Sequence, residues 1–263
     1  MINKRKLQRV TLQAHQVSPT LQINSAIALT PEQKHYLCNV LRLETGAEFI
    51  ALDRQAGWWL AKLTGEPDTA KIIAKLENNS ELAAQITLGI AMPKGSNIES
   101  VIRQTTELGV RQIVPLFSDR TILKVGTEIG NQKRDRWQRI AEEAAELSMR
   151  NYVPEINTPQ TFTEWLDQLA KSALPSLKYI CVTSPDAAHL LTTLQDVQKF
   201  PSEDGQVLNI VIVTGCEGGW TARESEMAIA SGFIPVSLGD RVLSAVTAPV
   251  VALSIIGAFL DTQ

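Results

Sequence analysis

The chain has 263 residues, 44% of them hydrophobic, which is enough to build a packed core in one or two domains. Its formal net charge of −3 excludes a polycation, although nucleic-acid binding requires only a local basic face. The three cysteines form no C-x-x-C pair, which argues against a zinc or disulfide framework and favours a reducing, cytoplasmic location. No apolar run reaches the roughly 18 residues that span a membrane, so no membrane is expected as a partner. No metal is expected either, because neither the cysteines nor the histidines have the spacing of metal ligands.

The first 80 residues predict a small β-rich unit with one helix. Thr30-Pro31-Glu32-Gln33 has the pattern of a capping box with proline in the first turn, so a helix begins there and stops near Gly46. The strands expected after it are 48–53, 58–63 and 71–76, and their spacing predicts a small barrel. Adjacent Trp58 and Trp59 would point to opposite faces of a strand, one into the core and the other onto a stacking surface.

A polar run over 77–81 marks the predicted boundary between two domains, 1–80 and 81–263. From Ile86 onward, strands and helices alternate, which predicts an α/β domain with a mostly parallel sheet. Its expected strands are 86–92, 112–117, 179–183, 209–214 and 234–238. S-x-x-E and T-x-x-E capping boxes at 96–99 and 221–224 predict helix starts, and a long helix is expected over about 133–149.

Two glycine-containing loops form the most informative part of the chain. The loop 215–219 follows a buried-type strand, and the loop 238–247 follows the next strand, one helix later. Ligands of open α/β sheets bind at the carboxyl ends of strands, and glycine lets main-chain groups approach a ligand closely. The sequence therefore predicts a ligand site made mostly of backbone, with a purely structural turn as the alternative.

The first of these loops differs from the known phosphate-binding loops. Neither G-x-G-x-x-G nor G-x-x-x-x-G-K-[ST] occurs in the chain. Glu217 would repel a phosphate but would accept a cationic ligand such as S-adenosylmethionine, whose sulfonium is positive. The residues expected to bind this cofactor are Thr183, Thr214, Gly215, Glu217, Gly218, Gly219, Leu238, Gly239, Val242, Leu243, Ser244 and Thr247.

Three further features have two interpretations each. The segment 248–260 is apolar nearly all round, so its helix is buried, either at a twofold dimer face or in the core. Arg120 follows a strand end and Arg150 closes the long helix. Each could contact a phosphate or a base edge, or could be a solvated ion-pair partner. The basic N-terminus is likewise either an RNA-binding face or an ordinary solvated surface.

Ordered motifs along the whole chain resemble the ribosomal RNA small subunit methyltransferase E family. They are His35-x-Leu37-x-x-Val40-Leu41-Arg42, Met92-Pro93-Lys94-Gly95, Glu107-Leu108-Gly109-Val110, Ser118-Asp119-Arg120, Arg150-Asn151-x-Val153-Pro154-Glu155-Ile156, Gly215-x-Glu217-Gly218-Gly219 and Leu238-Gly239-x-Arg241-Val242-Leu243. The resemblance implies a SPOUT-class α/β fold with a trefoil knot at the cofactor pocket, preceded by a PUA-like β-barrel that helps to hold RNA.

The activity that the resemblance implies is methylation of N3 of a specific uridine in 16S rRNA of the small ribosomal subunit. S-adenosylmethionine would be the methyl donor, and the enzyme would act as a homodimer. We expect Arg120, Arg150 and Glu217 to be the catalytic residues. The side chains expected to contact RNA are Arg5, Arg9, Arg42, Lys94, Arg120 and Arg150.

The chain departs from the family pattern at two places. Cys216 stands where the family usually has proline, and Ser244-Ala245-Val246-Thr247 stands where the family continues Arg-Thr-Glu-Thr. Two charged residues that would lie beside cofactor and substrate are therefore absent. One alternative is a catalytically weakened RNA-binding protein with a retained cofactor pocket, and another is a methyltransferase acting on a different RNA site. A different nucleotide-binding enzyme would need a phosphate loop that the chain lacks.

Overall fold

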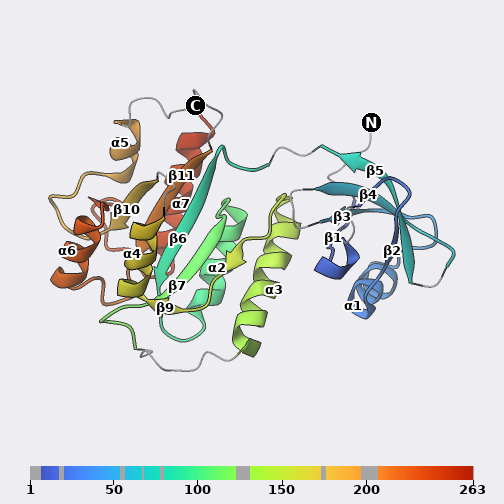
Figure 1. The fold of residues 1–263 in the computed structure, drawn as a ribbon, viewed down its shortest axis with the longest axis horizontal. Helices are drawn as coiled ribbons and strands as arrows, with labels where there is room; N and C mark the ends of the chain where they lie inside the picture. The colour runs from blue at the N-terminus through green and yellow to red at the C-terminus, as the bar shows by residue number, and fades with distance from the viewer. Residues whose placement is uncertain are drawn as a thin grey trace. The chain divides into compact units, whose positions relative to one another are not determined.

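The structure is a computed structural model that describes residues 7–17, 21–53, 57–66, 68–77, 80–122, 131–172, 176–196 and 207–262. The chain separates into two compact units (Figure 1). The first unit consists of residues 1–81 and 145–153, and the second of residues 82–144 and 154–263. A short segment from the middle of the chain thus belongs to the N-terminal unit.

The first unit contains a five-stranded sheet in the order β1-β3-β4-β5-β2. Its strands are β1 (Arg9–Thr11), β2 (Ala26–Ala28), β3 (Glu48–Leu52), β4 (Trp58–Leu63) and β5 (Thr69–Leu76). Its helical turns are η1 (Ala14–Gln16), α1 (Pro31–Lys34) and the π-helical η2 (His35–Val40). The three longer strands were predicted, whereas β1 and β2 were not, because three residues are too short to show an alternating pattern.

The predicted capping box at the start of α1 is confirmed. Thr30 Oγ1 accepts a hydrogen bond from the Gln33 main-chain N–H at 3.3 Å, and Gln33 Oε1 accepts one from the Thr30 N–H at 3.0 Å. The helical segment ends at Val40 rather than near Gly46, because Arg42 adopts a positive φ of 53° that breaks the helix.

The prediction of an exposed tryptophan stacking surface is wrong. Trp58 is fully buried and Trp59 is only 7% exposed. Both indole N–H groups also have acceptors within the first unit, since Trp59 Nε1 donates to Asp53 Oδ2 at 2.8 Å and Trp58 Nε1 donates to the Arg150 carbonyl at 3.3 Å. A buried indole with its N–H satisfied is a core residue, so neither ring is available to stack on a base.

The second unit is built on a seven-stranded sheet in the order β12-β10-β11-β6-β7-β8, with β9 also paired to β7, and every pair is parallel. Its strands are β6 (Ala84–Ala91), β7 (Gln112–Phe117), β8 (Glu155–Ile156), β9 (Gln160–Thr161), β10 (Leu177–Cys181), β11 (Leu208–Thr214) and β12 (Ile234–Val236). This arrangement confirms the α/β class and the parallel sheet expected from strand–helix alternation.

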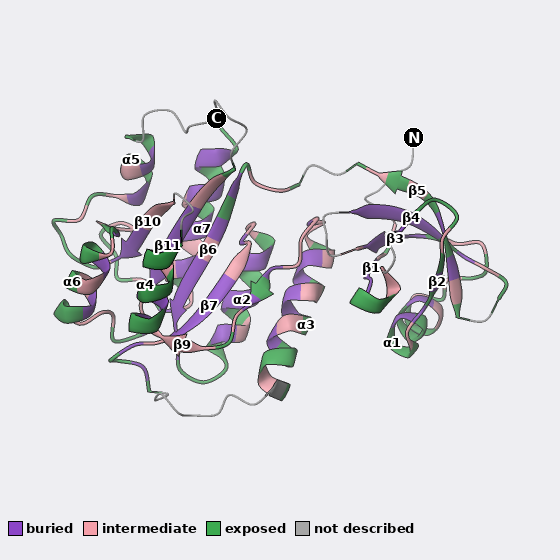
Figure 2. Cartoon of the chain, viewed as in Figure 1, coloured by how far each residue is buried: buried purple, intermediate pink, exposed green. Residues whose placement is uncertain are grey.

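Helices cover both faces of this sheet, so its central strands are buried (Figure 2). They are α2 (Asn97–Glu107), α3 (Asn131–Leu147), α4 (Phe162–Lys171), α5 (Leu190–Gln195), α6 (Ala222–Ala230) and α7 (Thr247–Leu260). Helix α7 packs against α2 and α5 and against the strands β6 and β11. Helix α4 forms a separate group, in which it packs against α6 and the strand β7. The predicted burial of the α7 segment is confirmed for most of its length, including Leu253 and Ile256, which are fully buried.

One of the two capping boxes predicted in this unit forms. At α6, Thr221 Oγ1 accepts from the Glu224 N–H at 3.2 Å and Glu224 Oε2 accepts from the Thr221 N–H at 2.8 Å. At α2, Ser96 makes no side-chain cap, because its φ of −94° and ψ of 8° lie outside the extended region that a capping residue needs.

Within the described part of the chain, no helix has the length and apolar character needed to cross a membrane. The same residues include no group of three or more His, Cys, Asp or Glu side chains placed to hold a metal ion.

Candidate functional site

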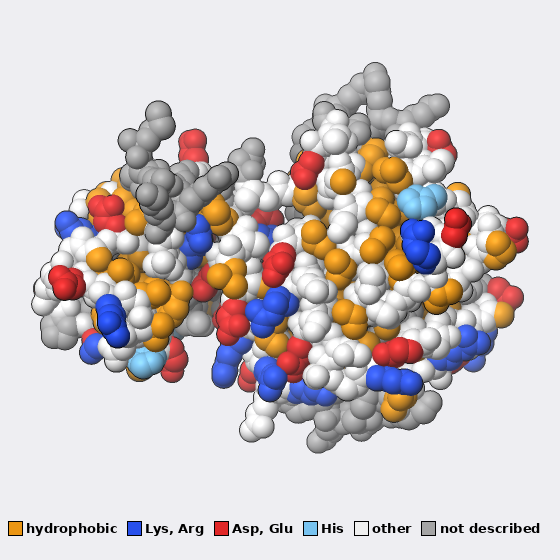
Figure 3. Space-filling model, turned by 180° about the vertical axis from the view of Figure 1, so that it is seen from behind, with side chains coloured by type: hydrophobic (Ala, Val, Ile, Leu, Met, Phe, Trp, Pro, Cys, Tyr) orange, Lys and Arg blue, Asp and Glu red, His pale blue; other side chains and the backbone are white. Residues whose placement is uncertain are grey.

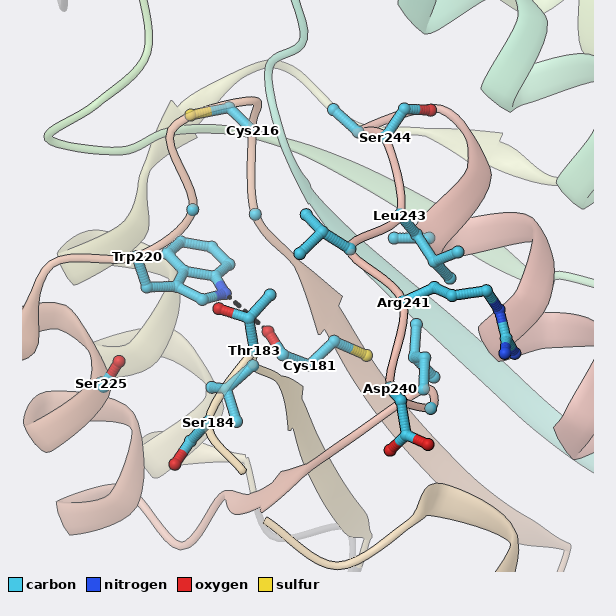
Figure 4. Close-up of a pocket in the computed structure, with 18 residues that line it drawn as sticks. Cys181, Thr183, Ser184, Cys216, Trp220, Ser225, Asp240, Arg241, Leu243 and Ser244 are labelled. Atoms are coloured by element: carbon cyan, nitrogen blue, oxygen red, sulfur yellow. Dashed lines mark hydrogen bonds between the residues drawn. The ribbon is translucent and has the colours of Figure 1, made fainter. Parts of the chain in front are cut away.

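A pocket with a volume of about 390 Å³ lies at the carboxyl ends of three neighbouring strands (Figure 4). Its walls come from the loops that follow β10, β11 and β12, which are adjacent in the sheet order β12-β10-β11. The residues that line it are 181–184, Gly215, Cys216, Gly219, Trp220, Ser225, 238–245 and Ala248. This is the edge of an open parallel sheet at which ligands bind.

The loop after β11 turns back closely on itself. A Cβ atom added at Gly215 would lie 3.1 Å from the Cα of Gly219, and Gly219 itself has a positive φ of 66°. Both positions therefore favour glycine, one because of a close backbone approach and the other because of its backbone conformation. The consequence is a wall of the pocket made of main chain.

Hydrogen bonds to residues that follow two other strands fix this loop. Glu217 Oε1 accepts a hydrogen bond of 3.0 Å from the main-chain N–H of Lys94, after β6. Arg120, after β7, donates from Nη1 to the Gly218 carbonyl at 2.6 Å. Charge-assisted hydrogen bonds of this kind are stronger than neutral ones, so they stabilise one conformation of the glycine loop.

The start of α6 adds a second attachment between the same two regions. Glu224 is 4% exposed and accepts from the Asp119 main-chain N–H at 2.8 Å while it caps its own helix. Asp119 Oδ2 in turn accepts from the Thr221 hydroxyl at 3.3 Å. A carboxylate that is buried and fully hydrogen-bonded in this way holds the loop after β7 against the N-terminus of α6.

Trp220 forms a rigid side wall of the pocket. Its ring stacks on Phe162 with centroids 4.7 Å apart, and its Nε1 donates to the Cys181 carbonyl at 3.2 Å. Cys181 lies beside it, and burial raises the pKa of this thiol to about 12, so the thiol stays protonated at neutral pH. Cys181 therefore supplies shape to the pocket and no nucleophile.

The loop after β12 completes the pocket. Gly239 has a φ of 112°, and its N–H donates to Ser237 Oγ at 3.1 Å. In the described structure, the main-chain N–H groups of residues 240–243 have no protein acceptor. Ser244 Oγ accepts from the Thr247 N–H at 3.1 Å, which starts α7. The loop thus presents unpaired main-chain donors beside the cavity.

The structure places most of the predicted cofactor residues on the wall of this pocket. The ones that line it are Thr183, Gly215, Gly219, Leu238, Gly239, Val242, Leu243 and Ser244. Glu217 and Gly218 instead make the contacts that hold the glycine loop, and Thr247 begins α7. Thr214 is fully buried at the end of β11, and its hydroxyl has no partner among the described residues.

Sequence reasoning missed several lining residues. Outside the two predicted loops they are Cys181, Val182, Ser184, Trp220, Ser225 and Ala248. Most of them directly flank a predicted residue or loop, so extending the prediction to the whole loop after β10 and by one residue at each glycine loop would have included them. Ser225 lies inside α6, and no local pattern marks it as a pocket residue.

The predicted RNA contacts are spread over both units. Arg150 is 3% exposed within the first unit, where its Nη2 donates to Glu81 Oε2 at 2.6 Å. Burial lowers the pKa of Arg9 in β1, and Arg42 is exposed after η2. Lys94 and Arg120 are exposed at strand ends of the second unit. Arg5 lies outside the described residues.

Glu81 is tied to the Arg150 segment by more than the ion pair. Its Oε1 accepts from the main-chain N–H groups of Asn151 at 2.7 Å and Tyr152 at 3.2 Å. Next to it, the Ser80 hydroxyl donates to the Met149 carbonyl at 2.6 Å. Arg150 is therefore part of the internal structure of the first unit.

Comparisons with known proteins agree with this architecture. Residues 80–257 match a family model described as an RNA methyltransferase domain, and residues 29–77 match one described as an RNA methyltransferase PUA domain. A ribosomal RNA small subunit methyltransferase E from Synechocystis is 42% identical over 247 residues, which cover 94% of this chain and 77% of that protein. A Bacillus subtilis protein of the same name is 28% identical and covers 94% of this chain and 93% of its own length.

Solved structures show the same fold. A ribosomal RNA small subunit methyltransferase E from Neisseria gonorrhoeae, bound to S-adenosyl methionine, has a TM-score of 0.81 and 27% identity, covering 98% of this chain and all (100%) of that one. A methyltransferase from Legionella pneumophila, in complex with the same cofactor, has a TM-score of 0.79 and 28% identity, covering 96% and 98% of the two chains. The chain therefore belongs to the RNA methyltransferase family that includes ribosomal RNA small subunit methyltransferase E, with a SPOUT-type parallel sheet and an N-terminal PUA-like unit.

Proposed function

We propose that this chain transfers a methyl group from S-adenosylmethionine to N3 of a specific uridine in 16S rRNA of the small ribosomal subunit. The observation that carries the proposal is the pocket at the ends of β10, β11 and β12, which lies inside the matched RNA methyltransferase domain. The Neisseria gonorrhoeae and Legionella pneumophila relatives with this fold bind S-adenosyl methionine.

The chemistry of the pocket suits this cofactor. Its volume of about 390 Å³ lies within the range of roughly 300–1,000 Å³ that is usual for small-molecule sites. Leu238, Val242 and Leu243 offer apolar surface to a nucleoside, and the main-chain N–H groups of 240–243 are available to acceptors on a purine ring. When bound, the cofactor supplies an electrophilic methyl group on a positively charged sulfur.

The protein's part in such a displacement is mainly to position the two reactants. The glycine loop 215–219 and the loop 238–247 hold one of them through main-chain contacts. Glu217 orients the glycine loop through Lys94, and this bond leaves its second carboxylate oxygen available as a proton acceptor.

Arg120 is the proposed contact for the uracil oxygens or an RNA phosphate. It is exposed and donates one of its five N–H groups to the Gly218 carbonyl. Its other donors have no acceptor among the described residues, so they could stabilise a uracil anion once N3 loses its proton. The uridine must leave its stack to reach this position. The burial of Arg150 against Glu81 favours a structural role for that residue over a direct catalytic one.

The remaining parts of the proposal concern the whole molecule. We propose that the PUA-like unit helps to hold RNA through Arg9 and Arg42, with Lys94 contributing from the second unit. We also propose a homodimer, because hydrophobic side chains are exposed in a band on one face of the second unit (Figure 3). The trefoil knot, the domain limits 1–80 and 81–263 and a cytoplasmic location belong to the same proposal.

A second candidate function is an RNA-binding module without catalysis. It is favoured by Ser244-Ala245-Val246, because Ser244 uses its hydroxyl to start α7 and none of the three carries a charge. Methyl transfer to small ribosomal subunits separates the two candidates, since a module that keeps its pocket would bind S-adenosylmethionine without transferring the methyl group.

The activity itself is tested on ribosomal subunits. Small subunits from a strain that lacks the gene are incubated with the protein and labelled S-adenosylmethionine, and the modified base is mapped by mass spectrometry. We expect one methyl group on N3 of one uridine. Gly215→Ala should reduce labelling because its Cβ would lie 3.1 Å from Gly219 Cα and displace the glycine loop, whereas Gly65→Ala, whose Cβ meets nothing closer than 4.0 Å, should not. Label on another base, or none, contradicts the proposal.

A further inference from the structure

The charged side chains on the wall of the pocket are adjacent in sequence. Among the described lining residues, only Asp240 and Arg241 carry formal charges, and both lie on the loop after β12. Their contributions to the cavity differ. Arg241 extends away from Trp220 and Thr183, whereas the Asp240 carboxylate lies at the lower rim of the view, across from Ser184 (Figure 4).

Arg241 leaves the Asp240 charge uncompensated. The Arg241 guanidinium folds back over its own loop, with Nη2 only 3.4 Å from where a Cβ on Gly239 would lie. In the described part of the chain, Asp240 forms neither an ion pair nor a hydrogen bond. The pocket therefore has a carboxylate at its rim that forms no ion pair with any cation among the described residues.

The backbone that carries Asp240 is fixed. Ser237 Oγ accepts from the Gly239 N–H at 3.1 Å and donates to the Gly239 carbonyl at 3.3 Å. The Ser237 main chain is itself anchored, since its N–H donates to the Ala188 carbonyl at 2.8 Å and its carbonyl accepts from Leu190 at 2.9 Å. These bonds fix the turn from which the exposed Asp240 extends.

The facing wall also favours a positive charge. The Trp220 ring is held in place by Phe162 and the Cys181 carbonyl, and aromatic faces attract cations. A cationic group of a ligand would gain from the ring or from the Asp240 carboxylate, according to which one it lies near, because a partly enclosed site screens charges less than bulk water does. A neutral ligand of the same shape would gain from neither.

We propose that Asp240 is a specificity-determining residue of the pocket, whose carboxylate recognises a positively charged group of the methyl donor. This inference rests on the proposed function, since it assumes that the pocket binds S-adenosylmethionine. Where the recognised charge is the sulfonium, the inference has a consequence for turnover. Transfer of the methyl group from sulfur to the uracil nitrogen would leave the bonding electron pair on sulfur, so the ligand would lose one positive charge and its attraction to Asp240 would fall, which would favour product release.

The test is titration calorimetry with three ligands that carry two, one and no positively charged groups. The probes are S-adenosylmethionine, S-adenosylhomocysteine, which lacks the sulfonium charge, and methylthioadenosine, which carries neither sulfonium nor ammonium. For Asp240→Asn we expect the affinity for S-adenosylmethionine to fall about three- to tenfold and that for methylthioadenosine to change less than about twofold. Asp240→Glu should recover most of the loss, and the wild-type affinity for S-adenosylmethionine should weaken with added salt more than that of Asp240→Asn.

The matched control is Asp186→Asn, which removes an exposed carboxylate from the loop after β10 that does not line the pocket. It should bind all three ligands as the wild type does. An unchanged affinity of Asp240→Asn for S-adenosylhomocysteine identifies the sulfonium as the recognised charge, and a parallel fall identifies the ammonium. Both results support the proposal.

Two results overturn the inference. One is an unchanged affinity of Asp240→Asn for S-adenosylmethionine, and the other is an equal loss for methylthioadenosine, which would mean that the residue shapes the loop. In both cases the wild-type protein still binds S-adenosylmethionine, so the proposed function stands. A wild-type protein that binds none of the three ligands contradicts the proposed function as well.

Discussion

Single glycines determine the shape of the proposed cofactor site. Gly239, with its φ of 112°, occupies a backbone conformation that other residues adopt only with strain of about 1–3 kcal/mol. We predict that Gly239→Ala lowers the free energy of unfolding by an amount in that range and weakens S-adenosylmethionine binding at least tenfold. Chemical denaturation and calorimetry measure the two effects.

The control for this prediction is Gly232→Ala at the end of α6. Its φ of 86° makes it similarly strained, and an added Cβ meets nothing within 4 Å. It should lose comparable stability and keep full affinity for the cofactor. Equal losses of affinity in the two variants would mean that strain alone, and not the shape of the pocket, explains the effect.

Arg150 gives a second prediction at the residue scale. Removing one partner of a buried ion pair leaves an uncompensated charge and typically costs 3–5 kcal/mol. Glu81 is 21% exposed, so we expect Glu81→Ala to lower the free energy of unfolding by about 3 kcal/mol, near the lower end of that range. Urea denaturation followed by tryptophan fluorescence measures the loss, with Trp58 and Trp59 in the first unit and Trp137, Trp165 and Trp220 in the second.

The comparison variant is Glu99→Ala, which removes a hydrogen-bonded ion pair with Arg136, a side chain that is 68% exposed. Such pairs contribute less than about 1 kcal/mol. A Glu81→Ala variant no less stable than Glu99→Ala would contradict the structural role of Arg150. It would return this arginine to the set of candidate RNA contacts.

The sequence shows at this scale which residues lie near the pocket but not which ones face it. Glycine spacing identified both loops, because backbone requirements are local. The burial of Arg150 could not be predicted, since its partner Glu81 is 69 positions away and belongs to a run that reads as a polar linker. The sequence placed Thr214 and Glu217 correctly beside the glycine loop 215–219, but the directions of their side chains depend on the packing of neighbouring strands.

Helix caps provide a pH-dependent test at the scale of single elements. The Thr161 hydroxyl hydrogen-bonds the Glu164 carboxylate at the start of α4, and this bond, with a second one from the Thr161 main chain, lowers the pKa of Glu164. A depressed folded-state pKa means that the stabilisation is present above the unfolded value of about 4.3 and is lost as the pH falls through the folded value.

We therefore predict that Thr161→Ala destabilises the protein at pH 7 and that the difference from the wild type narrows as the pH falls through this range. Thermal unfolding at a series of pH values measures it. Thr163→Ala, at an exposed position in the same turn, should show no pH-dependent difference. A difference between Thr161→Ala and wild type that stays constant down to pH 3 would count against the assigned carboxylate contact.

Elements with strong local signals could be predicted, and weak ones could not. The strand Gln112–Phe117 was expected with its observed limits, and glycines 109 and 232 both have the positive φ typical of helix ends. The capping box predicted at Ser96 does not form, because the Ser96 backbone is not extended and its hydroxyl does not accept a hydrogen bond from the first turn of α2. Strands β1 and β2 depend on pairing with distant strands, and three residues carry no pattern of their own.

At the scale of the whole molecule, we predict that cofactor binding stabilises the folded state of the second unit. A ligand at 100 times its dissociation constant contributes about 2.7 kcal/mol to the state that binds it. Hydrogen exchange read by mass spectrometry should therefore show S-adenosylmethionine protecting residues 181–184, 215–220 and 238–245. The β3–β4 region of the first unit serves as an internal reference. Protection confined to the first unit would contradict the position of the site.

The α/β class of the second unit was predictable because the hydrophobic pattern of the sequence alternates between strands and helices. The order β12-β10-β11 was not, since strands 177–181 and 234–236 become neighbours only through crossovers. That order decides which loops meet, and it brings the loop after β10 into the pocket beside the two glycine loops. The prediction from sequence therefore found two of the three walls and only Thr183 of the third.

The proposed function requires that the loops after β10, β11 and β12 enclose the methyl donor. A crystal structure of the wild-type chain grown with saturating S-adenosylmethionine decides this point. We expect density for the whole nucleoside between Trp220, the glycine loop 215–219 and residues 238–244. Cofactor density elsewhere on the chain, with these loops closed on each other, would refute the proposal.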